Sequence, residues 1–156
     1  MKVEYLSLAD AANQAEDGKF NILGMGARII NYERLPGFSP LAIVAAVSAM
    51  ASETGEYPVE IRIEEPDGTK ETIVKSRAIV NAKVDDERVP TGIALSVGMM
   101  RPFRIEGVHK VRLNVGPLEA SYEFLVRVAP VPAASERPPT QSSQPVKRRR
   151  TGRSAR

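Results

Sequence analysis

The chain has 156 residues, of which 42% are hydrophobic and 26% are charged, with a formal net charge of +3, and this is the composition of an ordinary globular protein. It contains no cysteine, which excludes disulfides, thiolate zinc sites and cysteine nucleophiles. Its single histidine, His109, excludes metal sites built from several imidazoles and leaves one candidate for histidine-dependent catalysis.

The first part of the domain is predicted to consist of short strands joined by turns. Asp10 could cap a brief helical turn over residues 8–15, on the connection between the first two strands. Gly24 and Gly26 fit a bulge or a bend with positive φ between the next two strands. The strands are expected at residues 3–8, 20–23 and 27–32.

The longest apolar run, residues 41–51, is compatible with two structures. Ser39 and Pro40 could begin a helix over this alanine-rich segment. Ile43 and Val47 equally suit a central strand that is buried on both faces, and periodicity does not distinguish the two. We predict a strand, because the neighbouring elements are strands and an all-β core needs a fully covered member. A helix here would make the fold α+β.

A hairpin is predicted in the middle of the domain. In residues 59–64 branched and charged residues alternate, which is typical of a strand with one face in a core and the other in water. Residues 65–69 then place proline and glycine where a tight turn needs them. The second strand of this hairpin is expected at residues 72–75, continuing toward residue 80.

Three further strands complete the predicted domain. One is expected at residues 93–99, and the alternating runs 109–115 and 122–128 flank a turn at Gly116 and Pro117, which predicts a second hairpin. Many short strands separated by turns indicate an all-β fold, an antiparallel two-sheet sandwich.

The end of the chain differs from the rest in charge and composition. Residues 1–129 carry 15 lysines and arginines against 18 acids, a net charge of −3, whereas residues 130–156 carry seven basic residues and one acid, a net charge of +6. The second segment holds five of the twelve prolines and no aromatic residue, so it buries too little apolar surface to offset the entropy lost on ordering. We therefore predict a β-sandwich domain over residues 1–129 and a disordered Pro-rich and Arg-rich tail over residues 130–156.

A pattern near the start of the chain resembles a known family. Leucine-alanine-aspartate at residues 8–10, a glycine-lysine pair at residues 18–19 and an Ile-Leu-Gly-Met-Gly run at residues 22–26 are similar to a family of small uncharacterised bacterial proteins, a domain of unknown function. The resemblance extends more loosely through residues 41–68 and 107–128. It implies a compact β-sandwich, immunoglobulin-like or C2-like, without an established activity, and it assigns no catalytic or binding residue.

The acidic residues Asp85, Asp86 and Glu87 are the one candidate for a metal site. With Asp67 or Asp17 they could bind calcium at one end of the sandwich, because hard cations take several oxygen ligands from loop tips. An exposed polar loop is the favoured interpretation, since neither a loop glycine nor a regular alternation of acids accompanies them. We therefore assign no metal and no cofactor.

His109 and residues 99–104 are the remaining candidates within the domain. His109 is in phase with Val111 and Leu113, so a structural role near the rim of the core is expected. No Gly-x-Ser-x-Gly motif identifies a serine for a hydrolytic triad, and we do not predict an enzyme. Residues 99–104, two methionines followed by two arginines, could form a partner-binding patch, but the end of a core strand is the favoured interpretation.

The last ten residues are strongly basic, with six cations and no acid. Clustered cations on a flexible chain release counterions from polyanions, so an attachment to nucleic acid would be weak, independent of base sequence and dependent on salt. Acidic protein surfaces would attract the same residues, and no aromatic side chain is present to stack on bases. The candidate polyanion-binding residues are Lys147, Arg148, Arg149, Arg150, Arg153 and Arg156.

Together these features favour a non-enzymatic β-sandwich module that binds or scaffolds a protein partner, with the basic tail as an electrostatic tether. The alternative is a nonspecific polyanion-binding protein that acts mainly through the tail. Edge strands can take up a strand from a partner or from a second copy, so a homodimer is compatible with this fold. The chain has neither an apolar run long enough to span a membrane nor a secretory signal, so we expect a cytoplasmic location.

Overall fold

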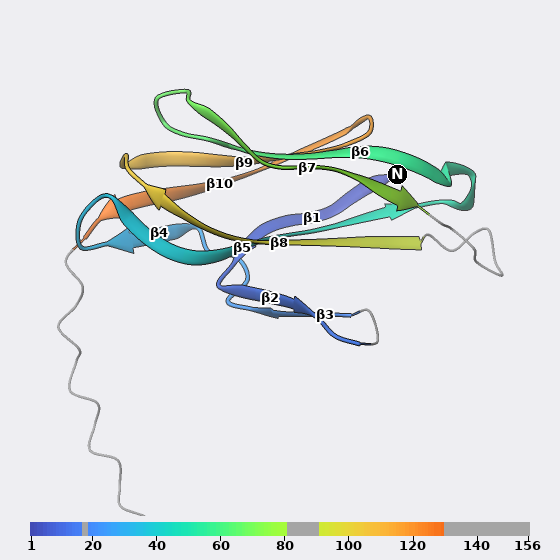
Figure 1. Cartoon of the computed structure of the whole chain (residues 1–156), viewed down its shortest axis with the longest axis horizontal. Coiled ribbons are helices and arrows are strands. Elements are labelled where there is room, and N and C mark those ends of the chain that lie inside the picture. The colour runs from blue at the N-terminus through green and yellow to red at the C-terminus, as the bar shows by residue number, and fades with distance from the viewer. Residues whose placement is uncertain (17–18, 81–90, 130–156) are drawn as a thin grey trace, which may run out of the picture.

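The computed structural model describes residues 1–16, 19–80 and 91–129, and it shows two stacked β-sheets with a small hairpin beside them (Figure 1). One sheet has three strands in the order β1-β5-β8, and the other has five in the order β4-β10-β9-β6-β7. The predicted all-β sandwich is confirmed. The elements are β1 (Lys2–Ala9), β2 (Ala11–Gln14), β3 (Phe20–Leu23), β4 (Ile29–Tyr32), β5 (Gly37–Ala49), a 3-10 turn (Ala51–Glu53), β6 (Gly55–Glu64), β7 (Lys70–Val80), β8 (Thr91–Phe103), β9 (Gly107–Val115) and β10 (Leu118–Val128).

The alternating segments put their apolar residues between the two sheets, as predicted. On β6, Ile61 and Ile63 are buried, and on β9 the same holds for Val111 and Leu113. β6 pairs antiparallel with β9, so that Ile61 lies opposite Leu113. This pairing joins the two predicted hairpins, β6–β7 and β9–β10, into one sheet.

β5 is the strand that is covered on both faces. Leu41, Ile43 and Val47 pack in the core between the sheets. Ala42 and Val44 point the other way and belong to a second small cluster, in which Ile22 of the β2–β3 hairpin packs against them. The predicted strand at residues 41–51 is therefore confirmed up to Ala49, and the helical alternative is wrong. The strand can be apolar on both faces because the β2–β3 hairpin covers the face that points away from the core.

The region after β1 differs from the sequence-based expectation in one respect. The helical turn at residues 8–15 is wrong, because β2 pairs antiparallel with β3 and places Ala12 opposite Ile22. The bend after β3 is confirmed, with φ of 65° at Gly24 and 98° at Gly26.

β4 departs from the antiparallel pattern of the other paired strands. It pairs in parallel with β10, with Ile29 opposite Leu125 and Tyr32 opposite Val128. It also begins at Ile29, two residues later than predicted. A parallel pair needs a long connection, and here the whole chain between β4 and β10 provides it.

Candidate functional site

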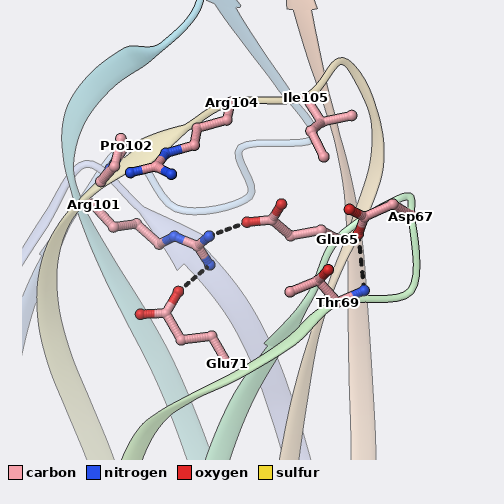
Figure 2. Close-up of a pocket in the computed structure, with 8 residues that line it drawn as sticks. All are labelled: Glu65, Asp67, Thr69, Glu71, Arg101, Pro102, Arg104 and Ile105. Carbon is pink, nitrogen blue, oxygen red and sulfur yellow. Dashed lines mark hydrogen bonds and ion pairs between the residues drawn. The ribbon is translucent and has the colours of Figure 1, made fainter.

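An ionic cavity of about 540 Å³ opens at one end of the sandwich, where the β6–β7 turn meets the end of β8 (Figure 2). The acids come from the β6–β7 hairpin, and the arginines come from β8 and the residue after it. Pro102 and Ile105 add apolar wall. The charged lining residues are Glu65, Asp67, Glu71, Arg101 and Arg104.

Arg101 is the central charge of this ionic cavity. Its side chain is only 11% exposed, its Nη2 donates to Glu65 Oε1, and its Nη1 lies 3.2 Å from Glu71 Oε2. The guanidinium carbon also lies 5.3 Å from the centre of the Phe103 ring. Two carboxylates thus compensate the enclosed cation, which fastens the end of β8 to the β6–β7 hairpin.

The acidic residues of the ionic cavity all have partners within the domain. Asp67 Oδ1 accepts the Thr69 N–H at 2.8 Å, and this backbone hydrogen bond lowers the pKa of Asp67. Glu65 and Glu71 are held by Arg101. The geometry therefore suits a structural ion pair that closes the end of the sandwich.

His109 lies on the inward face of β9, as its phase predicts, but it is fully buried instead of lying at the rim. Its ring stacks on Phe124 at 5.4 Å between centroids and meets Phe103 edge-on at 5.4 Å. Nδ1 lies 3.2 Å from the Gly107 carbonyl oxygen, and Nε2 is buried without a hydrogen-bond partner. Burial lowers the pKa of His109, so the ring is held neutral inside an aromatic cluster.

The acidic residues considered for a calcium site, and not assigned to one, fall largely outside the described residues. Asp85, Asp86, Glu87 and Asp17 lie there, and Asp67 takes part in the β6–β7 turn. Within residues 1–16, 19–80 and 91–129, no group of three or more histidines and acids is placed to hold a metal ion.

The outer face of the five-stranded sheet carries charges that compensate one another. Arg112 Nε donates to Glu64 Oε1 at 2.8 Å, and its Nη1 donates to Glu119 Oε1 at 2.6 Å. Lys110 Nζ lies 2.8 Å from Glu123 Oε1. The Arg112 hydrogen bond lowers the pKa of Glu64, and the Lys110 hydrogen bond lowers that of Glu123. This face is a solvated surface of paired charges.

The free edge of β8 is the second candidate site. β8 pairs with β5 along its thirteen residues and has no second neighbour among the described strands. Residues 92–100 carry no charge and no proline. The sequence predicts the strand at residues 93–99, but an edge position depends on strand order, which the sequence pattern does not reveal.

The other edge strands of the two larger sheets carry features that discourage pairing. β1 begins with Lys2 and Glu4 and shifts its register between Val3 and Tyr5. β7 carries Lys75 and further charges, and β4 has only four residues. Charges, irregular register and shortness all discourage the addition of a foreign strand. β8 lacks these features along residues 92–100.

An apolar cleft of about 200 Å³ lies beside the β8 edge, where β7 and β8 border the space between the sheets. Its apolar lining comes from Val59, Ile61, Val74, Leu95 and Val97, and its polar lining comes from Ser76, Arg77 and Ser96. Leu95 and Val97 pack against the core but remain partly exposed. The core is therefore incompletely covered along this edge.

Residues 99–103 form the end of β8 and Arg104 follows it, so this segment is the end of a core strand, the interpretation that the sequence favoured. Met99 packs against the core and Phe103 is fully buried. Met100 points to the opposite side and is 74% exposed. An apolar surface is thus present on the outer side of the strand, and it continues the uncharged edge.

The tail residues named as polyanion contacts, with the whole of residues 130–156, lie outside the described part of the chain. Their proposed role stays a prediction, and so does the boundary at residue 129. Among the residues that the structure describes, no helix has the length and apolar character of a membrane span.

The fold and these surfaces define the class of protein, a small all-β sandwich domain. The chain belongs to the family of unknown function DUF6941, which matches residues 4–127. This confirms the resemblance to a domain of unknown function. A comparison with curated proteins gives no match.

Among solved structures, the chain is similar to part of a beta-glucosidase from Listeria innocua, at 9% identity and a TM-score of 0.48, over 81% of this chain and 16% of the enzyme. The same enzyme in complex with glucose gives 9% identity and a TM-score of 0.47, over 80% and 16% of the two chains. The chain therefore spans only a small part of these enzymes, and a likeness of this strength does not bear on function.

Proposed function

We propose that this domain is a non-catalytic binding and scaffolding module whose contact surface is the free edge of β8. The observation that carries the proposal is the uncharged run of residues 92–100 on a strand with one described neighbour. Such an edge offers a row of backbone donors and acceptors to an extended partner segment. Leu95 and Val97, which are partly exposed, add apolar contacts beneath that segment.

The environment of His109 supports a non-catalytic role. The chain's single histidine is enclosed by Phe103 and Phe124 and is fully buried, so a substrate cannot reach it. The carboxylates of the ionic cavity are in turn held by Arg101. His109 and the carboxylates of the ionic cavity therefore have structural roles in this proposal.

The basic tail is proposed to act as an electrostatic tether. It begins beyond Ala129, whose N–H donates to the Tyr32 carbonyl at 3.0 Å, and it carries a net charge of +6 against −3 for the rest of the chain. A cationic segment attracts acidic surfaces and polyanions through long-range charge interactions.

The edge proposal is tested by placing a charge on β8 in the full-length chain. No atom lies within 4 Å of a Cβ built on Gly98, so Gly98→Lys should fold normally while adding a cation to the edge. Ser121→Lys adds the same cation at an exposed position of β10 and is the matched control. We expect Gly98→Lys to lose the proteins that the parent chain and the control capture from an extract of the source cells, as quantified by mass spectrometry. Equal capture by all three chains would reject the edge as the contact surface.

Deleting residues 130–156 distinguishes the tail alternative from binding at the β8 edge. Capture that survives the deletion and is lost in Gly98→Lys supports the sandwich as the binding surface. Capture that disappears with the tail, and also in modestly raised salt, supports the polyanion-binding alternative, because counterion release makes such binding steeply salt-dependent.

A further inference from the structure

We infer that the strand which adds to β8 is β8 of a second copy, paired antiparallel about a two-fold axis at Ser96. The three-stranded sheets of the two copies would then form one continuous sheet of six strands. The inference rests on the proposed function and names the partner for the same edge. It is carried by the self-complementarity of residues 92–100.

The inward side of the strand matches itself in this register. With the axis at Ser96, Leu95 lies opposite the partner subunit's Val97, and Ile93 lies opposite the partner subunit's Met99. All four are core-packed residues that remain partly exposed in the single domain. Pairing would cover them in both copies at once, because directly opposed side chains on one face of a ladder are in contact.

The outward side is also complementary. Met100, 74% exposed, lies opposite the partner subunit's Gly92, and Ala94 lies opposite the partner subunit's Gly98. A Cβ built on either glycine would meet no atom within 4 Å, so there is open space for the opposing side chain. The exposed methionine would thus lie over a residue that has no side chain to clash with it.

The charges at the end of the strand do not oppose this pairing. Arg101 is the first charged residue after the run, and in this register it lies opposite Thr91. This register keeps the two arginines at opposite ends of the paired strands, and each side chain is turned inward onto Glu65 and Glu71.

Neighbouring registers fit less well. An axis at Val97 places Ile93 opposite Arg101, an apolar side chain against a charge. An axis at Leu95 places Met100 opposite residue 90, which lies outside β8, so this register does not pair the exposed methionine within the strand. An axis between two residues would oppose inward and outward side chains, because the side-chain period of a strand is two. The register at Ser96 avoids all three conflicts.

The absence of cysteine from the chain makes a disulfide test free of background. In Ser96→Cys the two sulfur-bearing positions face each other across the axis, within the Cα separation that a disulfide requires. Ala94→Cys lies on the same face of the same strand, but its two copies are four residues apart along the ladder, about 13 Å. A mixture of Ala94→Cys and Gly98→Cys places the two thiols opposite each other again.

We expect full-length Ser96→Cys to form an intersubunit disulfide nearly completely under mild oxidation. Ala94→Cys alone should remain uncrosslinked. The mixture of Ala94→Cys and Gly98→Cys should give the mixed dimer on a non-reducing gel. Light scattering of the unsubstituted chain should give twice its 17.0 kDa mass, and Gly98→Lys should reduce this to the single mass. A monomeric parent chain, or equal crosslinking of Ser96→Cys and Ala94→Cys, overturns the inference.

The two proposals fail in distinguishable ways. If the parent chain is monomeric while Gly98→Lys still abolishes capture of another protein, the second copy is the wrong occupant and the edge remains the binding surface. The edge itself is rejected if Gly98→Lys still forms the dimer and still captures the same proteins as Ser121→Lys. Circular dichroism must show that both variants are folded.

Discussion

Arg101 and Glu65 form an ion pair at the end of the sandwich, with both side chains only 11% exposed. Arg101 belongs to β8 of the three-stranded sheet, and Glu65 follows β6 of the five-stranded sheet. The pair therefore connects the two layers at the point where the core ends. Glu71, whose side chain is 54% exposed, is the second and more solvated partner of the same guanidinium.

We expect Glu65→Gln to destabilise the domain by about 3 kcal/mol, because removing one member of an enclosed ion pair leaves the other charge uncompensated. Glu71→Gln is the matched control and should cost less than about 1 kcal/mol, since an exposed pair contributes little. Urea unfolding followed by circular dichroism measures both. Equal effects of the two substitutions would show that burial of the pair is energetically unimportant.

Gly37 lies against the ring of Tyr32, and a Cβ built on it would be 2.2 Å from a ring carbon. Gly37→Ala should therefore cost about 1–3 kcal/mol through overpacking. Gly98→Ala, where no atom lies within 4 Å, should be neutral or stabilising by up to about 1 kcal/mol, because alanine reduces the entropy of the unfolded chain. Thermal unfolding of the two variants distinguishes them, and a shared shift in Tm would contradict the close approach of Gly37 and Tyr32.

His109 should make the stability of the domain depend on pH in a defined direction. Burial lowers the pKa of this histidine from its ordinary value of 6.5, and Arg101 lowers it further, while the Gly107 carbonyl, Glu65 and Asp67 offset the effect. Between the lowered pKa and 6.5 the unfolded chain binds more protons than the folded one, so stability is full above 6.5 and falls as the pH drops through that window.

The measurement is the urea midpoint at about pH 7.5 and about pH 5.5, a range above the titration of ordinary carboxylates. The parent chain should be less stable at the lower pH. His109→Leu removes the titrating ring, so its difference between the two pH values should be smaller whatever its absolute stability. A variant that keeps the full difference would place the responsible group elsewhere.

Deletion of residues 130–156 should leave the thermal transition nearly unchanged, because the buried residues of the described chain lie between Ser7 and Val126. The same deletion should abolish retention on heparin, since it removes seven of the 22 basic residues and leaves a net charge of −3. Differential scanning calorimetry and heparin chromatography test the two parts. Loss of folding on deletion would contradict the predicted domain boundary.

The strands with period-two alternation could be predicted from sequence because that signal is local. In residues 59–64 and 109–115 each branched residue marks the inward face, and the structure places these side chains in the core. The glycine bend at residues 24–26 was predictable for a similar reason, since positive φ favours one residue type. The helical turn at residues 8–15 was wrong because the cap signal of Asp10 is weaker than the pairing of β2 with β3.

The sequence alone determined most of the strands, the inward faces of the alternating ones and the charge difference between a net-acidic part and a basic end, since composition and periodicity are properties of consecutive residues. Beyond the two predicted hairpins, only the tertiary structure decided which strands are neighbours. The pairing of Arg101 with Glu65, 36 residues away, and the exposure of β8 as an edge both follow from strand order. One sequence signal for the ion pair existed, because Arg101 is in phase with the inward Met99 and Phe103. The partner of that charge is a long-range contact, and no local spacing encodes it.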